Sequence, residues 1–285
     1  MKTAVAAAAL TATGLGYALA QAHRALPPRR VPLLGLGAAF VFAAQMVNFP
    51  VVGGTSGHLI GGTLIAAWLG LPAAIIVMTT VLVAQCFLFA DGGVTALGAN
   101  LFNMAVIAPV VGWAVFRGVG RLLPGRRGQV AAVAFAGWCS TVATVPDQAS
   151  IHLLIGLGEG AISALVFYAV VKARPEWATE APAWTWRGFV GYGLLVAAGV
   201  ALFVAPFACP WPDGLEAVAA KLGFEHAAQT PLAAPLADYA LPGIASAGLA
   251  TALAGLVGTL VVFGLAVLLS RWLVKREPTE APDQG

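Results

Sequence analysis

The chain has 285 residues, of which 60% are hydrophobic and only 9% are charged. A soluble fold of this length needs far more polar surface, so the composition indicates a protein whose solvent is lipid. The net charge of +3 is modest and provides no basic footprint for nucleic acid, which we therefore exclude as a partner.

In chain order, the apolar residues form segments separated by short polar stretches. With roughly 20 residues needed per crossing, we predict nine transmembrane segments near residues 3–22, 32–49, 57–70, 72–90, 95–116, 129–145, 149–171, 188–207 and 248–270. The third is short, because about fourteen residues rise only about 21 Å. The predicted fold class is an all-α integral membrane protein.

Almost all basic residues occur in clusters between these segments. The clusters are Arg24/Arg29/Arg30, Arg117/Arg121/Arg126/Arg127, Lys172/Arg174/Arg187 and Arg271/Lys275/Arg276. Because Lys and Arg in short loops stay on the cytoplasmic side, the clusters predict a multi-pass protein of the cytoplasmic membrane. Its N-terminus would lie outside and its C-terminus inside.

The first segment has an alternative interpretation as a secretory signal. Lys2, an alanine-rich run and Ala18-Leu19-Ala20 resemble a signal sequence with a small-residue cleavage site. Cleavage would leave the Arg24 cluster outside, immediately before the next span, against the positive-inside trend. We therefore expect a spanning helix here.

Shifts in composition divide the chain into two membrane units. Residues 1–173 form the first unit, and the polar stretch 174–187 is a predicted cytoplasmic linker. Residues 188–275 form the second unit, which has two spans and an external loop that starts at Cys209. Residues 276–285 are a predicted disordered cytosolic tail.

Polar side chains gather at the predicted external ends of the spans, where they form a candidate pocket. A membrane chain keeps such groups only where something uses them. They lie between segments two and three, between four and five, and around the start of segment seven: Ser56, His58, Asp91, Asn100, Asn103, His152 and Glu159.

For most of these residues a structural role is the simpler interpretation. A lone histidine such as His58 is more often hydrogen-bonded than a ligand, and Asp91-Gly92-Gly93 is most simply a turn. Glu159, on a glycine-flanked helix seven residues after His152, must be paired, protonated or hydrated. It is either a structural clamp against Asn100, Asn103 or Gln85, or part of an ion path.

Several motifs in order resemble a known family. The run Phe40–Pro50 (FVFAAQMVNFP), the segment Gly53–Leu59 (GGTSGHL), Phe89–Gly93 (FADGG) and the Gly156–Gly160 helix (GLGEG) closely resemble the CbiM/NikM substrate-binding component of energy-coupling-factor cobalt and nickel transporters. The remainder resembles the PDGLE domain, a CbiN-like unit, whose signature is Pro212–Glu216. Asp213 and Glu216 also fit a helix capping box. The resemblance implies a seven-helix bundle followed by two helices.

In this family, the resemblance implies that Ni²⁺ or Co²⁺ is held by an N-terminal Met-His and by the histidine matching His58. The ion is substrate, and no resident cofactor is implied. Nitrogen donors suit Ni²⁺ and Co²⁺ about equally, so the sequence does not choose between them. This chain begins Met1-Lys2-Thr3 and therefore lacks the histidine that follows the first Met in the family. Either the natural start lies upstream, which we favour, or the Met1 amine is part of a reduced site.

The resemblance also implies partner proteins. The sequence has no G-x-x-x-x-G-K-[ST] nucleotide-binding loop, so we expect a non-enzymatic component. Energy would come from CbiO/NikO-like ATPases through a CbiQ/NikQ-like transmembrane coupling protein.

A second function fits part of the pattern. Gly54–Gly57 (GTSG) also matches the G-x-S-G of rhomboid-type intramembrane serine proteases. In that hypothesis Ser56 is the nucleophile and His152 is the base, at hydrogen-bonding distance.

Overall fold

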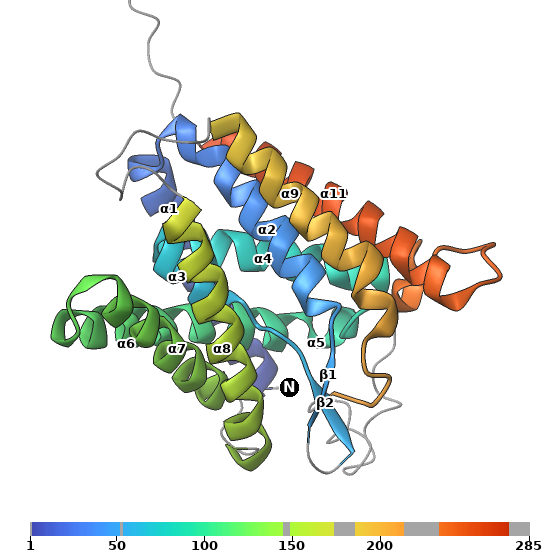
Figure 1. Cartoon of the computed structure of the whole chain (residues 1–285), viewed down its shortest axis with the longest axis horizontal. Helices are drawn as coiled ribbons and strands as arrows, with labels where there is room; N and C mark the ends of the chain where they lie inside the picture. The colour runs from blue at the N-terminus through green and yellow to red at the C-terminus, as the bar shows by residue number, and fades with distance from the viewer. Residues whose placement is uncertain (1, 52–53, 145–148, 174–185, 214–233, 274–285) are drawn as a thin grey trace, which may run out of the picture.

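The computed structural model describes residues 2–51, 54–144, 149–173, 186–213 and 234–273. These residues are mostly helical (Figure 1). The long helices are α1 (Lys2–Ala25), α2 (Val31–Gln45), α4 (Leu71–Phe89), α6 (Ala108–Leu122), α7 (Gly125–Thr144), α8 (Ala149–Ala173), α9 (Trp186–Phe203) and α11 (Ala247–Leu273). The shorter elements are η1 (Pro28–Arg30), β1 (Phe49–Val51), β2 (Thr55–Gly57), α3 (Gly62–Leu69), α5 (Gly93–Asn100), the π-helical turn η2 (Leu101–Ile107), η5 (Ala205–Phe207) and η7 (Ala237–Tyr239).

Helices α2 and α4 form the centre of the molecule and are buried along most of their length. Both carry a proline in the first turn, where the missing N–H costs nothing. Helix α4 is separated from α3 only by Gly70, whose φ of +94° breaks the helical path. Their side chains build the main hydrophobic core, in which Phe42 and Phe89 pack with ring centroids 5.1 Å apart.

Helices α9 and α11, from the second unit, lie side by side along α2 (Figure 1). Small residues allow this close approach, as is usual between membrane helices. At Gly258, an added Cβ would lie 2.3 Å from the Phe42 ring, so no larger residue fits there without rearrangement. The second unit is thus packed closely against the first.

Helices α6, α7 and α8 form the other side of the molecule, next to α3. Here too the contact depends on glycine: an added Cβ at Gly160 would lie 2.5 Å from the Ala134 carbonyl oxygen of α7. The close α7–α8 packing fixes the depth of Glu159 on α8, whose side chain is fully buried.

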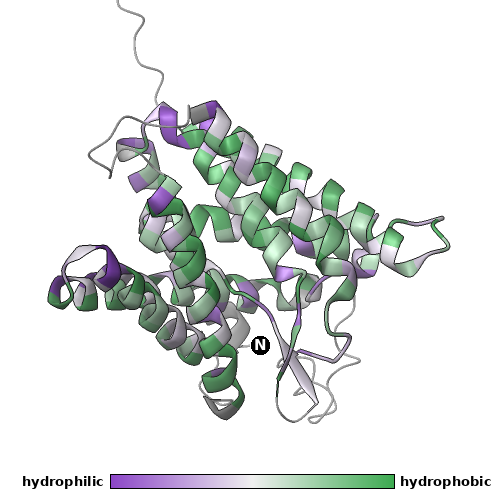
Figure 2. Ribbon diagram, viewed as in Figure 1, coloured by the Kyte–Doolittle hydropathy of each residue, from purple (hydrophilic) through white to green (hydrophobic). Residues whose placement is uncertain are grey.

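Among the described residues, five helical stretches are long and apolar enough to cross a membrane: Leu71–Phe89, Ala96–Leu122, Ile151–Ala173, Arg187–Phe207 and Ala247–Leu273. They correspond to predicted segments four, five, seven, eight and nine. The mid-parts of the helices are apolar, and hydrophilic residues gather at their ends (Figure 2). Large apolar side chains such as Leu195 and Leu268 are exposed on this surface, as expected for contact with lipid.

The predicted count of nine spans is not confirmed. Helices α2 and α3 have 15 and 8 residues and rise only about 22 and 12 Å, less than a hydrocarbon core of about 30 Å. Helices α1 and α7 have 24 and 20 residues but are rich in Ala, Gly and Thr, which makes them less apolar. The predicted linker at 174–187 falls largely, and the predicted tail at 276–285 wholly, outside the described residues.

The prediction of an all-α chain is wrong between α2 and α3. There, β1 and β2 form an antiparallel hairpin in which Phe49 pairs with Gly57 and Val51 with Thr55. Segment two was predicted to reach residue 49, but α2 ends at Gln45, and α3 begins only at Gly62. The hairpin leads directly to His58 and projects from the end of α2 (Figure 1).

Candidate functional site

The candidate site is built on the hairpin and on residues 58–61, which link β2 to α3. The His58 imidazole lies on this link, and its side chain is 25% exposed. Nδ1 of His58 is 3.1 Å from the Leu59 carbonyl oxygen. Because a carbonyl oxygen can only accept, this contact favours a proton on Nδ1 and leaves the Nε2 lone pair available.

Glu159 on α8 fixes the link of residues 58–61 through hydrogen bonds to its backbone. Its carboxylate accepts the backbone N–H of Ile60 at 2.6 Å and that of Gly61 at 3.0 Å. These N–H groups lie at the start of α3, where helix geometry provides no internal partners. The Gln45 side-chain amide donates to the Ile60 carbonyl oxygen at 2.9 Å. The backbone after His58 is therefore fixed by buried groups on two helices. Glu159 acts as a clamp, but on the backbone of Ile60 and Gly61 rather than on the predicted side chains of Asn100, Asn103 or Gln85.

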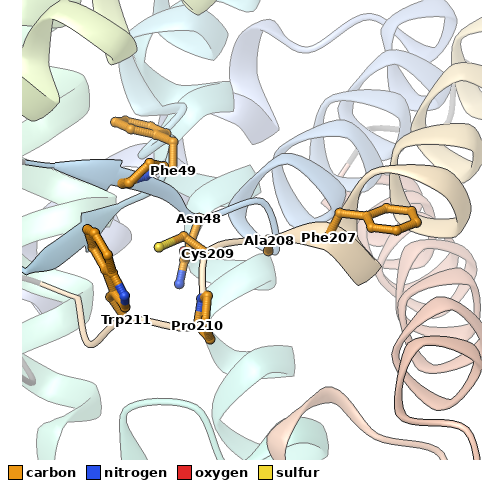
Figure 3. Close-up of a pocket in the computed structure, with 8 residues that line it drawn as sticks. Asn48, Phe49, Phe207, Ala208, Cys209, Pro210 and Trp211 are labelled. Atoms are coloured by element: carbon orange, nitrogen blue, oxygen red, sulfur yellow. The ribbon is translucent and has the colours of Figure 1, made fainter.

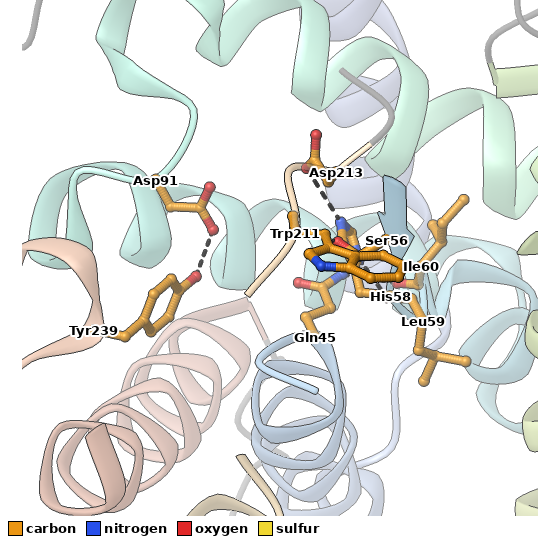
Figure 4. A network of polar contacts seen from close by, with 9 residues as sticks. All are labelled: Gln45, Ser56, His58, Leu59, Ile60, Asp91, Trp211, Asp213 and Tyr239. Carbon is orange, nitrogen blue, oxygen red and sulfur yellow. Dashed lines mark hydrogen bonds and ion pairs between the residues drawn. The ribbon is translucent and has the colours of Figure 1, made fainter. Parts of the chain in front are cut away.

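A segment of the second unit docks on the hairpin (Figure 4). The N–H of Cys209 donates to the Asn48 carbonyl oxygen at 2.9 Å, and that of Ser56 donates to the Pro212 carbonyl oxygen at 2.9 Å. The Ser56 hydroxyl donates to the Trp211 carbonyl oxygen at 2.7 Å. Residues 211–213 thus run along β2, where Ser56 and Asp213 form a parallel bridge.

This docking brings a carboxylate to the histidine. Nε2 of His58 lies 3.9 Å from Oδ2 of Asp213 (Figure 4). The side chains are 25% and 29% exposed, so the pair is reachable from solvent. Asp213 was predicted to cap a helix, and its contact with His58 was not predicted. The capping partner Glu216 lies outside the described residues.

Next to the docked segment is an open groove of about 460 Å³ (Figure 3). One wall comes from the hairpin and the other from the chain that follows α9. It is lined by Asn48, Phe49, Pro50, Phe207, Ala208, Cys209, Pro210 and Trp211. The lining is mainly apolar, so the groove is a packing boundary between the two units rather than a site for a cation.

A second contact between the units lies at the end of α4. The Tyr239 hydroxyl donates to Oδ2 of Asp91, and its ring stacks on Phe89 with centroids 4.7 Å apart. The N–H of Leu236 donates to the Leu88 carbonyl oxygen at 2.9 Å. Burial and the Asp91 carboxylate raise the pKa of the Tyr239 phenol well above its ordinary value. Asp91 was predicted to line the pocket. Its Oδ2 accepts this hydrogen bond, and its role in the pocket stays a prediction.

The structure places the remaining predicted residues as follows. His152 is buried on α8 in the turns before Glu159, as predicted from their spacing. Asn100 packs against Gly92, where an added Cβ would be 2.4 Å from its side-chain nitrogen, and Asn103 lies in η2. Their role in the pocket stays a prediction. Met1 lies outside the described residues.

No group of three or more His, Cys, Asp or Glu side chains suited to a metal ion occurs within the part of the chain that the structure describes. Ser56 is fully buried, and its hydroxyl proton is directed at Trp211 rather than at a base. This arrangement disfavours the serine-protease hypothesis.

Comparison with known proteins decides the family. The profile described as "Cobalt uptake substrate-specific transmembrane region" (CbiM) matches residues 1–146, and that of the PDGLE domain matches residues 187–276. The chain belongs to the CbiM family and carries a C-terminal PDGLE domain. Asp213 and Tyr239 thus come from the PDGLE domain.

Similar proteins cover the whole chain or part of it. The chain is 36% identical over 276 residues to a "Putative fused nickel transport protein NikMN" of Archaeoglobus fulgidus, covering 90% of this chain and 91% of that protein. It is 44% identical over 93 residues to the "Fused nickel transport protein NikMN" of Rhodobacter capsulatus, covering 33% and 27%. A crystal structure of a truncated transition metal transporter superposes with a TM-score of 0.51 at 31% identity, covering 60% of this chain and 94% of that one.

Proposed function

We propose that this protein is the substrate-binding component of an energy-coupling-factor importer for Ni²⁺ or Co²⁺. It would accept the ion from outside and release it inside, with its N-terminus outside and its C-terminus in the cytoplasm. The proposal is supported by membership of the CbiM family and by relatives named as nickel or cobalt transport proteins. A PDGLE domain fused to the C-terminal side of the CbiM part is consistent with the fused nickel transport proteins among these relatives.

One structural observation carries the proposal: His58 is partly exposed on a backbone fixed by buried groups. A ligand held in this way loses little conformational entropy when it binds an ion. Its imidazole nitrogen is a donor that Ni²⁺ and Co²⁺ favour over the oxygen cages suited to Mg²⁺. His58 would be the direct ligand, joined by the N-terminal end. Ser56, Asp91, Asn100, Asn103 and His152 would shape the surroundings.

We further propose that the chain works with a CbiQ/NikQ-like coupling protein and CbiO/NikO-like ATPases, whose hydrolysis would drive release of the ion. The sequence contains no nucleotide-binding loop of the Walker type, which supports the proposal that partner chains supply the energy. Association with such partners is testable by purification of the full complex from cells that express all components.

The decisive experiment measures accumulation of radioactive nickel or cobalt by cells that express this chain with its partner proteins. The variant His58→Ala is expected to abolish uptake, because the imidazole is the direct ligand. His23→Ala is the matched control, since His23 is in the last turn of α1, beside the end of α11, with Nδ1 2.8 Å from the Leu273 carbonyl oxygen. Normal uptake by His58→Ala at normal expression would refute the ligand assignment.

A further inference from the structure

The PDGLE domain delivers Asp213 to the histidine through backbone contacts. Ser56 is fully buried, and its N–H and hydroxyl both bind the segment that ends at Asp213. His58 follows β2 directly, two residues after Ser56, and its Nε2 lies 3.9 Å from Oδ2 of Asp213. Backbone hydrogen bonds of residues 211 and 212 with Ser56 therefore fix the position of Asp213 next to His58.

The distance between the His58 and Asp213 side chains is longer than a hydrogen bond but short enough for both to bind one metal ion. At 3.9 Å, His58 Nε2 and Asp213 Oδ2 are too far apart for a hydrogen bond, which needs about 2.7–3.2 Å. Nitrogen and oxygen ligands lie about 2.0–2.2 Å from a first-row divalent cation such as Zn²⁺, so two ligands of one ion are separated by at most about 4.3 Å. The observed separation falls within this reach.

The chemistry of His58 Nε2 and Asp213 Oδ2 also suits two ligands of one metal ion. The contact with Leu59 favours the proton of His58 on Nδ1, which leaves an unprotonated Nε2 at 3.9 Å from Oδ2 of Asp213. Imidazole nitrogen and carboxylate oxygen are both accepted by Co²⁺ and Ni²⁺. The carboxylate also supplies negative charge at a position reachable from solvent, which favours the approach of a dication.

We propose that Asp213 is a direct ligand of the ion at His58, so that the cation site spans the CbiM part and the PDGLE domain. This inference rests on the proposed function, because it takes His58 as the primary ligand. It gives the PDGLE domain a specific role: it donates one oxygen to the coordination sphere on the solvent side of the imidazole.

The test uses the full-length protein in detergent and Co²⁺ alone as the probe, with affinity measured by calorimetry. Asp213→Asn is expected to weaken Co²⁺ binding by about tenfold or more, since an ionised ligand is replaced by a neutral amide. Asp238→Asn is the matched control: Asp238 is an exposed aspartate of the same domain, and asparagine tolerates its φ of +53°. Its affinity should equal that of the unaltered protein.

A second variant separates a ligand from a residue that only supports the loop. Asp213→Cys places a thiolate at the same position, and a thiolate bound to Co²⁺ produces an intense charge-transfer band in the near ultraviolet. We expect this band in Asp213→Cys and not in the unaltered protein. Its appearance upholds the proposal even where Asp213→Asn expresses poorly.

Each remaining outcome also upholds or overturns the assignment of Asp213 as a ligand. Absence of the band overturns the proposal, whatever the affinity of Asp213→Asn, and leaves a through-space charge pair only. His58→Ala, measured in parallel, distinguishes the two levels of inference. Lost Co²⁺ binding in His58→Ala together with no band in Asp213→Cys would leave the proposed function intact and remove only the role of Asp213. Unchanged binding in His58→Ala would remove both.

Discussion

Replacement of Glu159 tests whether the His58 link depends on a buried carboxylate. In Glu159→Ala, the N–H groups of Ile60 and Gly61 lose their acceptor at the start of α3. A buried N–H left unsatisfied costs about 1–3 kcal/mol, so two of them cost about 2–6 kcal/mol of unfolding free energy. In Glu159→Gln, the amide oxygen still accepts one N–H, while the NH₂ group faces the other, so we expect roughly half that loss.

The measurement is thermal unfolding of the purified protein in detergent, followed by tryptophan fluorescence, together with Co²⁺ affinity. Stability should fall in the order unaltered protein, Glu159→Gln, Glu159→Ala, and affinity should fall in the same order because the link carries His58. Thr259→Ala is the matched control. Thr259 is also fully buried, but its hydroxyl only bonds the Gly255 carbonyl oxygen of its own helix at 2.7 Å. If Glu159→Ala is no less stable than Thr259→Ala, the clamp reasoning is wrong.

Two further predictions concern how the PDGLE domain is held. Tyr239→Phe removes the hydrogen bond to Asp91 but keeps the ring stacking, so we expect about 1 kcal/mol of lost stability by thermal unfolding. Because the pKa of Tyr239 is raised, its contribution is fully present below the ordinary tyrosine pKa of about 10 and is lost only as the pH rises through the higher folded value. A stability difference between the two proteins that disappears between pH 6 and 9 would contradict this. Gly258→Ala puts a Cβ 2.3 Å from Phe42 and should cost about 1–3 kcal/mol, whereas Gly264→Ala, with nothing within 4 Å, should not destabilise. Equal melting temperatures for the two glycine variants would show that α11 does not pack on α2 as described.

Hydrophobic patterning predicted the long helices well, because a run of about 20 apolar residues has few alternatives in a bilayer. Predicted segment 72–90 is the helix Leu71–Phe89, and 248–270 is Ala247–Leu273. The pattern failed where apolar residues are not in a spanning helix. Residues 49–57 are apolar or small, but strands of three residues leave no alternation to detect.

The site could be predicted only in part, for a related reason. His58 and Glu159 were identified because a histidine and a carboxylate are rare in apolar sequence. The contacts made by the second unit were not predicted. Those of Asp213 with His58 and of Tyr239 with Asp91 join residues more than 140 positions apart. Such pairs depend on how the second unit packs on α2, and no local pattern encodes that packing. The sequence motif around Asp213 was the only available signal.

The fusion of two units in one chain explains how weak polar contacts suffice at the site. The hydrogen bonds of Ser56 and Cys209 contribute about 0.5–1.5 kcal/mol each, too little to hold a separate protein against the cost of association. Close packing of α9 and α11 on α2 already fixes the PDGLE domain beside the hairpin. Docking of residues 209–213 is then intramolecular, and its entropic cost is small. Strong apolar contacts thus keep the domain in place, while the contacts next to His58 can remain few and individually weak.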